Sequence, residues 1–226
     1  MKGYGVLELT IASPAQTLSQ PVTLGEAKDY MRITETTPAD TSQNAIIEEM
    51  ISAAREIAEI EQGTDLIEKQ WDLHLDLMVG REAADALQLR SYRSIHDFGS
   101  KIQLRYPLQS VDLFQHTDNN GVVTTLIENT DYRVDTHRSL VTPPWGSMWP
   151  FYTPDVSSSV LIRFTSGYPA THPFWTGGAG QRIKKAIKEV VAGWYEQRIP
   201  YVQGSVQEQP FGAGRLLGYG MRPRVF

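Results

Sequence analysis

The hydrophobic periodicity of this chain changes twice along its length, and the two changes limit the folds it can adopt. Between residues 46 and 58 the apolar residues recur at helical spacing. From residue 70 the period becomes two, with apolar side chains at Trp71, Leu73, Leu75 and Leu77. The helical period returns between residues 183 and 195. This order predicts an α+β fold in which a small antiparallel core of about three helices is interrupted by a β-rich insertion.

Start and stop signals bound the predicted helices. Thr23 and Glu26 have capping-box spacing, which predicts a first helix to about Met31. Gly63 ends the second helix, and Pro200 ends the last, which follows a glycine run at 177–180 that we interpret as a flexible return from the insertion. The buried stripe of the second helix is predicted at Ile46, Ile47, Met50, Ile51, Ala54, Ile57 and Ala58. Its exposed face is predicted at Glu48, Glu49, Arg55, Glu56 and Glu59.

Short strand signals fill the middle of the chain and predict an antiparallel sheet or small barrel. After the alternating segment at 71–77, they fall at residues 87–89, 102–104, 111–114, 122–126, 132–134 and 160–164. Asp118-Asn119-Asn120-Gly121 lies between two of these signals. It predicts a hairpin turn, because asparagine and glycine adopt positive φ at little cost.

The same signals divide the chain into five predicted segments. These are an N-terminal arm at 1–22, the first part of the helical core at 23–66, the β-rich insertion at 67–176, the last helix at 177–200 and an extended tail at 201–226. The tail mixes apolar residues with glycine and proline, so it can bury little by itself. We therefore expect it to become ordered on a partner protein.

The net charge of the chain is −5, and the charged residues are distributed unevenly along the sequence. Residues 23–62 hold three cations and nine acids, whereas residues 181–226 hold eight cations and three acids. Such asymmetry can bring like subunits together head to tail, although two solvated faces without a partner would look the same. The candidate inter-subunit residues are Glu48, Glu49, Glu56, Glu59, Lys184, Lys185 and Lys188. The three lysines could also touch the phosphates of DNA in a channel.

Several function classes are excluded or disfavoured by the composition. The chain has no cysteine, so a disulfide framework, a thiolate nucleophile and a cysteine-ligated metal are impossible, and folding in a reducing cytoplasm fits. No apolar run approaches the ~20 residues that cross a bilayer, so we expect no membrane contact. Neither the phosphate-loop nor the dinucleotide-binding glycine spacing is met. We predict no catalytic residue, no cofactor and no resident metal.

Two local patterns support alternative functions. Asp72, His74 and Asp76 project from one face of a strand, where they could serve as ligands in a metal-dependent hydrolase or form an ordinary solvated face. The segment 143–152 is rich in aromatics and proline. Together with Trp175, its Trp145 and Trp149 could form a carbohydrate-binding platform, or the loop could pack its rings inward over the sheet edge.

A family resemblance links segments spread over nearly the whole chain. They are Pro21 to Lys28 before Met31-Arg32-Ile33, the helix from Ile46 to Gly63 leading into Gln70-Trp71-Asp72-Leu73, Tyr106 to Val111, Asp131 to Val134, Ile162 to Tyr168, Ala192 to Arg198 and Gln209 to Ala213. In this order and spacing the chain resembles the head-to-tail connector, or adaptor, proteins of long-tailed double-stranded DNA phages and gene-transfer agents.

The resemblance implies a structural protein of the virion neck, assembled in the host cytoplasm, without enzymatic activity. It implies a ring, commonly of twelve subunits, that joins the portal protein to a head-completion, stopper or tail-terminator protein and leaves a channel for DNA. It also implies portal binding by the C-terminal region. The tail residues that we expect to carry this contact are Phe211, Arg215, Leu216, Leu217, Tyr219, Arg222, Arg224 and Phe226.

Overall fold

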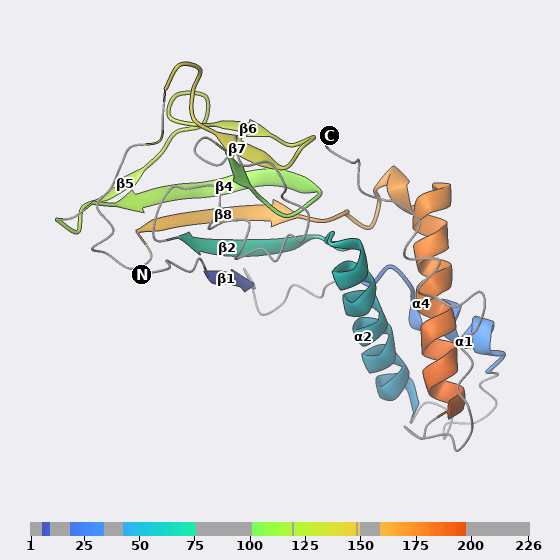
Figure 1. The fold of residues 1–226 in the computed structure, drawn as a ribbon. Coiled ribbons are helices and arrows are strands. Elements are labelled where there is room, and N and C mark those ends of the chain that lie inside the picture. The colour runs from blue at the N-terminus through green and yellow to red at the C-terminus, as the bar shows by residue number, and fades with distance from the viewer. Residues whose placement is uncertain are drawn as a thin grey trace, which may run out of the picture. The chain divides into compact units, whose positions relative to one another are not determined.

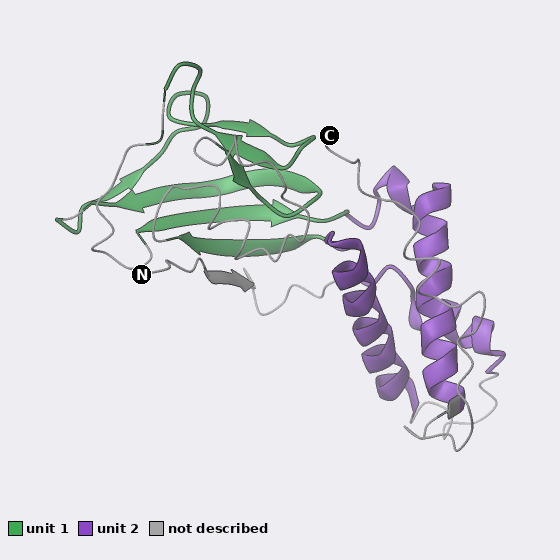
Figure 2. Cartoon of the chain, viewed as in Figure 1, with its two compact units in different colours: residues 1–18, 68–168 green, residues 19–67, 169–226 purple. Residues whose placement is uncertain are grey.

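The chain folds into two compact units in this computed structural model (Figure 2). A β unit comprises residues 1–18 and 68–168, and a helical unit comprises residues 19–67 and 169–226. The structure describes residues 6–9, 19–33, 43–75, 101–118, 120–147, 149 and 159–197. Within these residues, three α-helices and antiparallel strands confirm the predicted α+β class. The strand predicted at 87–89 and the tail predicted at 201–226 lie outside them.

Two antiparallel sheets build the β unit (Figure 1). The larger sheet has the order β1-β2-β8-β4-β5. Its strands are β1 (Val6–Leu9), β2 (Lys69–Leu75), β8 (Val160–Ser166), β4 (Leu108–Thr117) and β5 (Val123–Thr125). The smaller sheet has the order β3-β7-β6, with β3 at Ile102–Gln103, β7 at Leu140–Thr142 and β6 at Arg133–Asp135.

One hydrophobic core joins the two sheets. Side chains from both, including Leu73 of β2, Phe114 of β4 and Val141 of β7, are fully buried in it. Phe114 packs obliquely against two further rings, with centroids 5.0 Å from Tyr132 and 5.7 Å from Trp149. The predicted alternation on β2 follows from this core, because Leu73 and Leu75 point into it.

The predicted hairpin turn at 118–121 is confirmed between β4 and β5, which pair antiparallel. Gly121 has φ +79°, and the Asp118 carboxylate accepts hydrogen bonds from the backbone amides of Asn120 and Val122, at 2.9 and 2.8 Å. Two strands were not predicted. They are β1, four residues long, and β7, three residues long.

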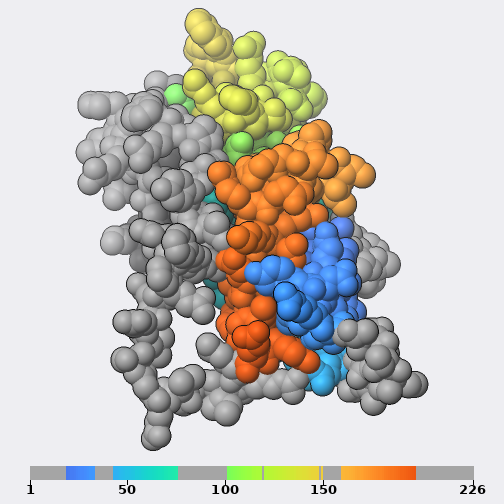
Figure 3. Space-filling model, turned by 90° about the vertical axis from the view of Figure 1, so that its right-hand side faces the viewer, coloured from blue at the N-terminus to red at the C-terminus, as the bar shows by residue number. Residues whose placement is uncertain are grey.

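The helical unit contains α1 (Leu24–Met31), α2 (Asn44–Gln62), the short 3-10 helix η2 (Pro173–Trp175) and α4 (Gly178–Gln197). The capping box at Thr23 and Glu26 is present, and Gly63 ends α2 with φ +60°, as predicted. The Tyr195 hydroxyl, near the end of α4, hydrogen-bonds Gln43 at the start of α2, so these two helices run antiparallel. Seen in space-filling form, α1 lies alongside α4 (Figure 3).

The glycine run before the last helix is not the flexible return that we predicted. Gly178 already begins α4, and Gly180 is buried against η2. A Cβ on Gly180 would lie 2.3 Å from the Phe174 carbonyl oxygen, so only glycine allows this close approach. Because η2 packs against α4, the segment 169–176 belongs to the helical unit, although we expected the insertion to extend through it.

Two glycines of α4 are therefore expected to respond oppositely to alanine. Gly180→Ala should lower the free energy of unfolding by about 1–3 kcal/mol, because its methyl group would overlap backbone. Gly193→Ala should raise it by about 0.5–1 kcal/mol, since a Cβ there meets nothing within 4 Å and alanine favours the helix. Urea denaturation of both variants checks this pair, and equal shifts in one direction would contradict the packing of η2 on α4.

Candidate partner-binding surfaces

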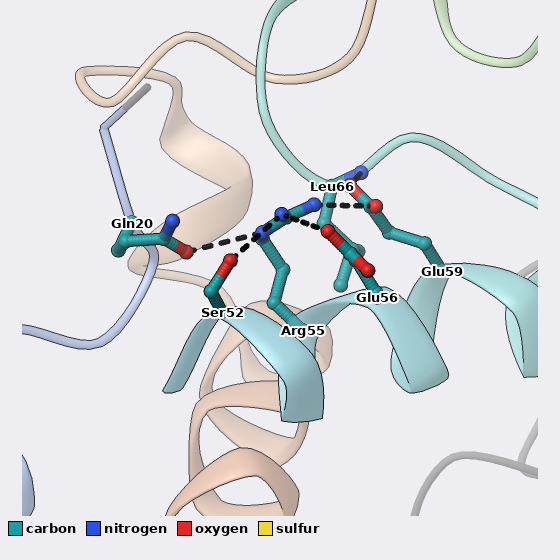
Figure 4. Close-up of polar contacts among 6 residues, drawn as sticks. All are labelled: Gln20, Ser52, Arg55, Glu56, Glu59 and Leu66. Carbon is teal, nitrogen blue, oxygen red and sulfur yellow. Dashed lines mark hydrogen bonds and ion pairs between the residues drawn. The ribbon is translucent and has the colours of Figure 1, made fainter. Parts of the chain in front are cut away.

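A buried ion pair fixes the inner side of α2 (Figure 4). Arg55 is 2% exposed, and its Nη1 donates to Glu59 Oε2 at 2.6 Å. Arg55 Nε donates to Gln20 Oε1 at 3.1 Å, and the other oxygen of Glu59 accepts from the Leu66 backbone amide at 3.0 Å. The pair thus connects α2 to the segment before α1 and to the segment that follows α2. Only Glu56, which accepts from Arg55 Nη2 at 3.2 Å, is exposed to solvent.

Both members of this pair lie on a face of α2 other than the one predicted. Arg55 and Glu59 were predicted on the exposed face of the helix, and that prediction was wrong. Charged groups can be buried when they are paired and hydrogen-bonded, as both are here. The i,i+4 spacing of an arginine and a glutamate was the available signal. Glu59 is therefore unavailable as an inter-subunit contact.

The outer side of α2 carries both acids and large apolar side chains. Glu48, Glu49 and Glu56 are exposed, as predicted. Ile46 and Ile57 were predicted in the buried stripe, but 51% and 41% of their surfaces are exposed, and Ile60 is 75% exposed. The buried stripe is narrower than predicted because one residue turns the helix by about 100°, which carries Ile46 and Ile57 away from their buried neighbours Ile47 and Ala58.

All three candidate lysines on α4 have partners within the chain. Lys184 lies 3.8 Å from Glu26 of α1, and its ammonium stands 6.0 Å from the centroid of the Trp175 ring. Lys188 stands 5.8 Å from the Tyr30 ring centroid. Both are half-buried, so they help to hold α1 and η2 against α4. Lys185 is exposed and lies 3.6 Å from Glu189, one turn further along the helix.

The three tryptophans proposed as a carbohydrate platform do not share one environment. Trp145 is 90% exposed, beside Gly146 with φ +78°. Trp149 and Trp175 are 4% and 6% exposed, so neither ring offers a flat surface to a sugar. The platform prediction was wrong for these two residues. The alternative, a loop that packs its rings inward, is confirmed for Trp149, which contacts Phe114 in the core.

The first of the candidate metal ligands on β2, Asp72, is engaged in an ion pair. Both oxygens of Asp72 accept hydrogen bonds from Arg163 of β8, each at 2.7 Å. This contact buries Asp72 to 8% exposure and explains why its side of β2 is not simply solvated. Asp76 lies outside the described residues, among which no three histidine, aspartate or glutamate side chains are grouped to hold a metal ion.

The same face of the sheet holds Asp112 in a hydrogen-bond network. Burial alone would raise the pKa of Asp112, but hydrogen bonds from Ser110, Gln70 and Thr165 and the charge of Arg163 lower it below its ordinary value of 3.8. The three donors lie 2.7–2.9 Å from the carboxylate. The network ties together β2, β4 and β8.

This lowered pKa predicts a pH dependence of stability. A carboxyl whose pKa is lower in the folded state stabilises the fold above its unfolded-state pKa, and this contribution disappears as the pH falls toward the folded-state value. The melting temperature of the wild type should therefore decrease once the pH is lower than about 4. The melting temperature of the Asp112→Asn variant should decrease less over the same pH range. Scanning calorimetry at a series of pH values from 7 downward measures both melting temperatures. If they decreased equally with pH in the two proteins, the hydrogen-bond network around Asp112 would be contradicted.

The portal-contact candidates, Phe211, Arg215, Leu216, Leu217, Tyr219, Arg222, Arg224 and Phe226, lie outside the described residues. Within the described part of the chain, no helix is both long and apolar enough to cross a membrane.

Comparison with known proteins connects the fold to one kind of particle. No family model and no curated protein matches the sequence. A chain in the structure of the neck of an empty GTA particle, computed with C6 symmetry, aligns with a TM-score of 0.65 and 21% identity, over 94% of this chain and 93% of its own.

Two further structures match over similar lengths. A chain in the virion of a native gene transfer agent particle aligns with a TM-score of 0.61 and 21% identity, over 93% of this chain and 92% of its own. A chain in the neck of a native GTA particle, computed with C12 symmetry, aligns with a TM-score of 0.57 and 20% identity, over 94% of this chain and 92% of its own. Over nearly its whole length, the chain therefore has the fold of proteins in the necks and virions of gene transfer agents.

Proposed function

We propose that this protein is a structural subunit of the neck of a phage-like particle, a head-to-tail connector without catalytic activity. The observation that carries the proposal is the shared fold, which covers 94% of this chain and 93% of the first neck chain. Both units of the present chain lie within such a match, so the likeness includes the β insertion as well as the helices. The independent sequence resemblance to connector proteins supports the same function.

The protein acts as a ring, which we propose to contain twelve copies. The neck structures with the shared fold were computed with C6 and C12 symmetry. A ring of more than two copies needs two different, complementary surfaces on each subunit. The uneven charge of the chain supports such surfaces, since residues 23–62 are acidic and residues 181–226 are basic. Of the candidate contacts, Glu48, Glu49, Glu56 and Lys185 are exposed.

The ring joins the portal protein on one side to a head-completion, stopper or tail-terminator protein on the other, and leaves a channel through which DNA passes. The C-terminal segment from Phe211 to Phe226 binds the portal, because its aromatic and arginine residues suit a groove with acidic edges. The protein is assembled in the host cytoplasm and remains in the virion neck. Exposed basic residues make non-specific contact with DNA there.

Light scattering coupled to size-exclusion chromatography tests this function on the full chain, alone and mixed with the portal protein. We expect a ring-sized species that co-elutes with portal, and negative-stain images should show a central opening. A protein that stays monomeric at every concentration and never joins portal would overturn the proposal. An unrelated acidic protein of similar size is the control for non-specific co-elution.

A further inference from the structure

The outer side of α2 presents a continuous apolar ridge. The ridge consists of Ile46, Met50, Ala53, Ile57 and Ile60, which follow one another at intervals of four, three, four and three residues. This is the spacing by which a helix forms a seam with another helix. Met50 is half-buried and the other four are exposed, so the described part of the chain leaves the ridge open, whereas it covers Ile47, Ile51 and Ala54.

Single exposed apolar residues are normal on protein surfaces, but this ridge extends along almost the whole helix. Contiguous apolar surface of this kind marks a site of association. α2 thus has two apolar stripes that lie in different environments. One packs inside the helical unit, where α2 contacts α1 and α4, and the other is exposed to solvent.

The charges beside the ridge disfavour pairing between two copies of α2. Glu49 and Glu56 are exposed along one edge of the ridge, and Glu61 is exposed near its end. Arg55 is the single cation in the α2 sequence, and it is buried in the ion pair with Glu59. Two ridges that met each other would bring carboxylates together without a compensating cation, which is unfavourable. A basic surface other than α2 complements these acids best.

A suitable surface lies on the outer side of α4. Arg182 and Lys185 are exposed in the first half of this helix, three residues apart, and therefore share one face. Lys185 also lies 3.6 Å from Glu189, but its side chain is 59% exposed, so its ammonium can still reach an acid of a neighbouring copy. Lys184 and Lys188 point instead toward α1 and η2, where they meet Glu26, Trp175 and Tyr30. The aliphatic stems of arginine and lysine can cover apolar side chains while their charged groups reach acids at the edge.

We propose that the apolar ridge of α2 binds the Arg182–Lys185 face of α4 in a second copy of this chain. The proposal rests on the proposed function, because it assigns the two surfaces that a ring requires. Each copy offers the ridge to one neighbour and the basic face to the other, so the contact is heterologous, which is the kind of contact that a ring of more than two copies requires. Glu49 and Glu56 of one copy approach Arg182 and Lys185 of the next.

Surface substitutions test the ridge without disturbing the fold. In Ile57→Ser/Ile60→Ser, the protein concentration at which half of the chains are assembled should rise at least about tenfold, since every contact in the ring loses apolar area. The matched control, Val122→Ser/Val123→Ser, removes two comparably exposed apolar residues from the β unit and should leave assembly unchanged. Mass photometry measures assembly, and circular dichroism confirms that both variants fold.

Cross-linking identifies the occupant of the ridge, because the chain has no cysteine of its own. One preparation carries Ile60→Cys and another carries Lys185→Cys. Treatment of their mixture with a short bismaleimide should give covalent dimers in much higher yield than either preparation alone. Dimers formed by Ile60→Cys alone, or no dimers in the mixture, would overturn the proposed pairing.

The outcomes separate this inference from the proposed function. If the wild-type chain forms rings with portal while Ile57→Ser/Ile60→Ser assembles as well as the Val122→Ser/Val123→Ser control, the ridge assignment fails and the connector function stands. If the wild-type chain forms no ring under any condition, the connector function fails first, and the ridge contact fails with it.

Discussion

Replacing Arg55 by methionine should lower the free energy of unfolding by about 3–5 kcal/mol, one of the two largest effects expected in this protein. The side chains of Arg55 and Glu59 are 3% and 5% exposed and lie 2.6 Å apart. Removing the guanidinium leaves the Glu59 carboxylate buried without its counter-charge, and the Gln20 side chain loses its donor. Equilibrium denaturation in urea at neutral pH measures the change.

Two further variants separate the buried pair from ordinary surface effects. Glu56→Gln removes an acid that also touches Arg55, but this side chain is 63% exposed, so the cost should stay below about 1 kcal/mol. Glu59→Gln added to Arg55→Met removes the stranded charge and keeps an oxygen that can accept from the Leu66 amide. The double variant should regain about 1–3 kcal/mol of the free energy of unfolding that Arg55→Met loses. If Arg55→Met cost no more than Glu56→Gln, the pair would not be buried as described.

Deleting residues 212–226 should abolish binding to the portal while leaving the protein folded. The described helices and sheets are built from residues before 198, so circular dichroism and the melting temperature should change little. The deletion removes several aromatic and arginine residues. Anchors of this type are each worth about 2 kcal/mol or more at an interface, so affinity should fall by more than about 1,000-fold. Surface plasmon resonance against purified portal measures the loss.

The control for this deletion changes two polar residues that precede the deleted segment. Gln203→Ala/Gln207→Ala should bind portal normally, because neither side chain offers an apolar or charged anchor. The deletion variant should still form rings alone, since the proposed ring contact lies on α2 and α4. Particles that are completed with the deletion variant at normal yield would contradict portal binding by this segment.

Local signals in the sequence were sufficient to predict the main elements. The capping box at Thr23, the terminal Gly63 and the hairpin turn at Asp118 all appear where their chemistry predicted them. The alternation on β2 was equally clear, because a strand with one side in a core must repeat every two residues. These features depend on neighbours in the sequence, which is why sequence alone revealed them.

Features that depend on distant partners could not be predicted in the same way. The burial of Arg55 requires Gln20, far from it in the sequence. From the sequence, Gly180 was predicted to be flexible, and only the structure shows that η2 packs closely against it. On α2, Glu48, Glu49 and Glu56 are exposed as predicted, but Glu59 is buried. The exposed Ile57 was assigned to the core because periodicity does not tell how wide the buried stripe is.

The central claim is that copies of this chain form a ring in the neck of a particle, and a cryo-electron microscopy reconstruction of that neck tests it most directly. The account predicts cyclic density next to the portal into which the helical and β units of this chain fit repeatedly. In that density, the ridge of α2 should meet α4 of the adjacent copy, and the C-terminal segment should lie on the portal. A neck whose rings are all accounted for by other chains would contradict the claim.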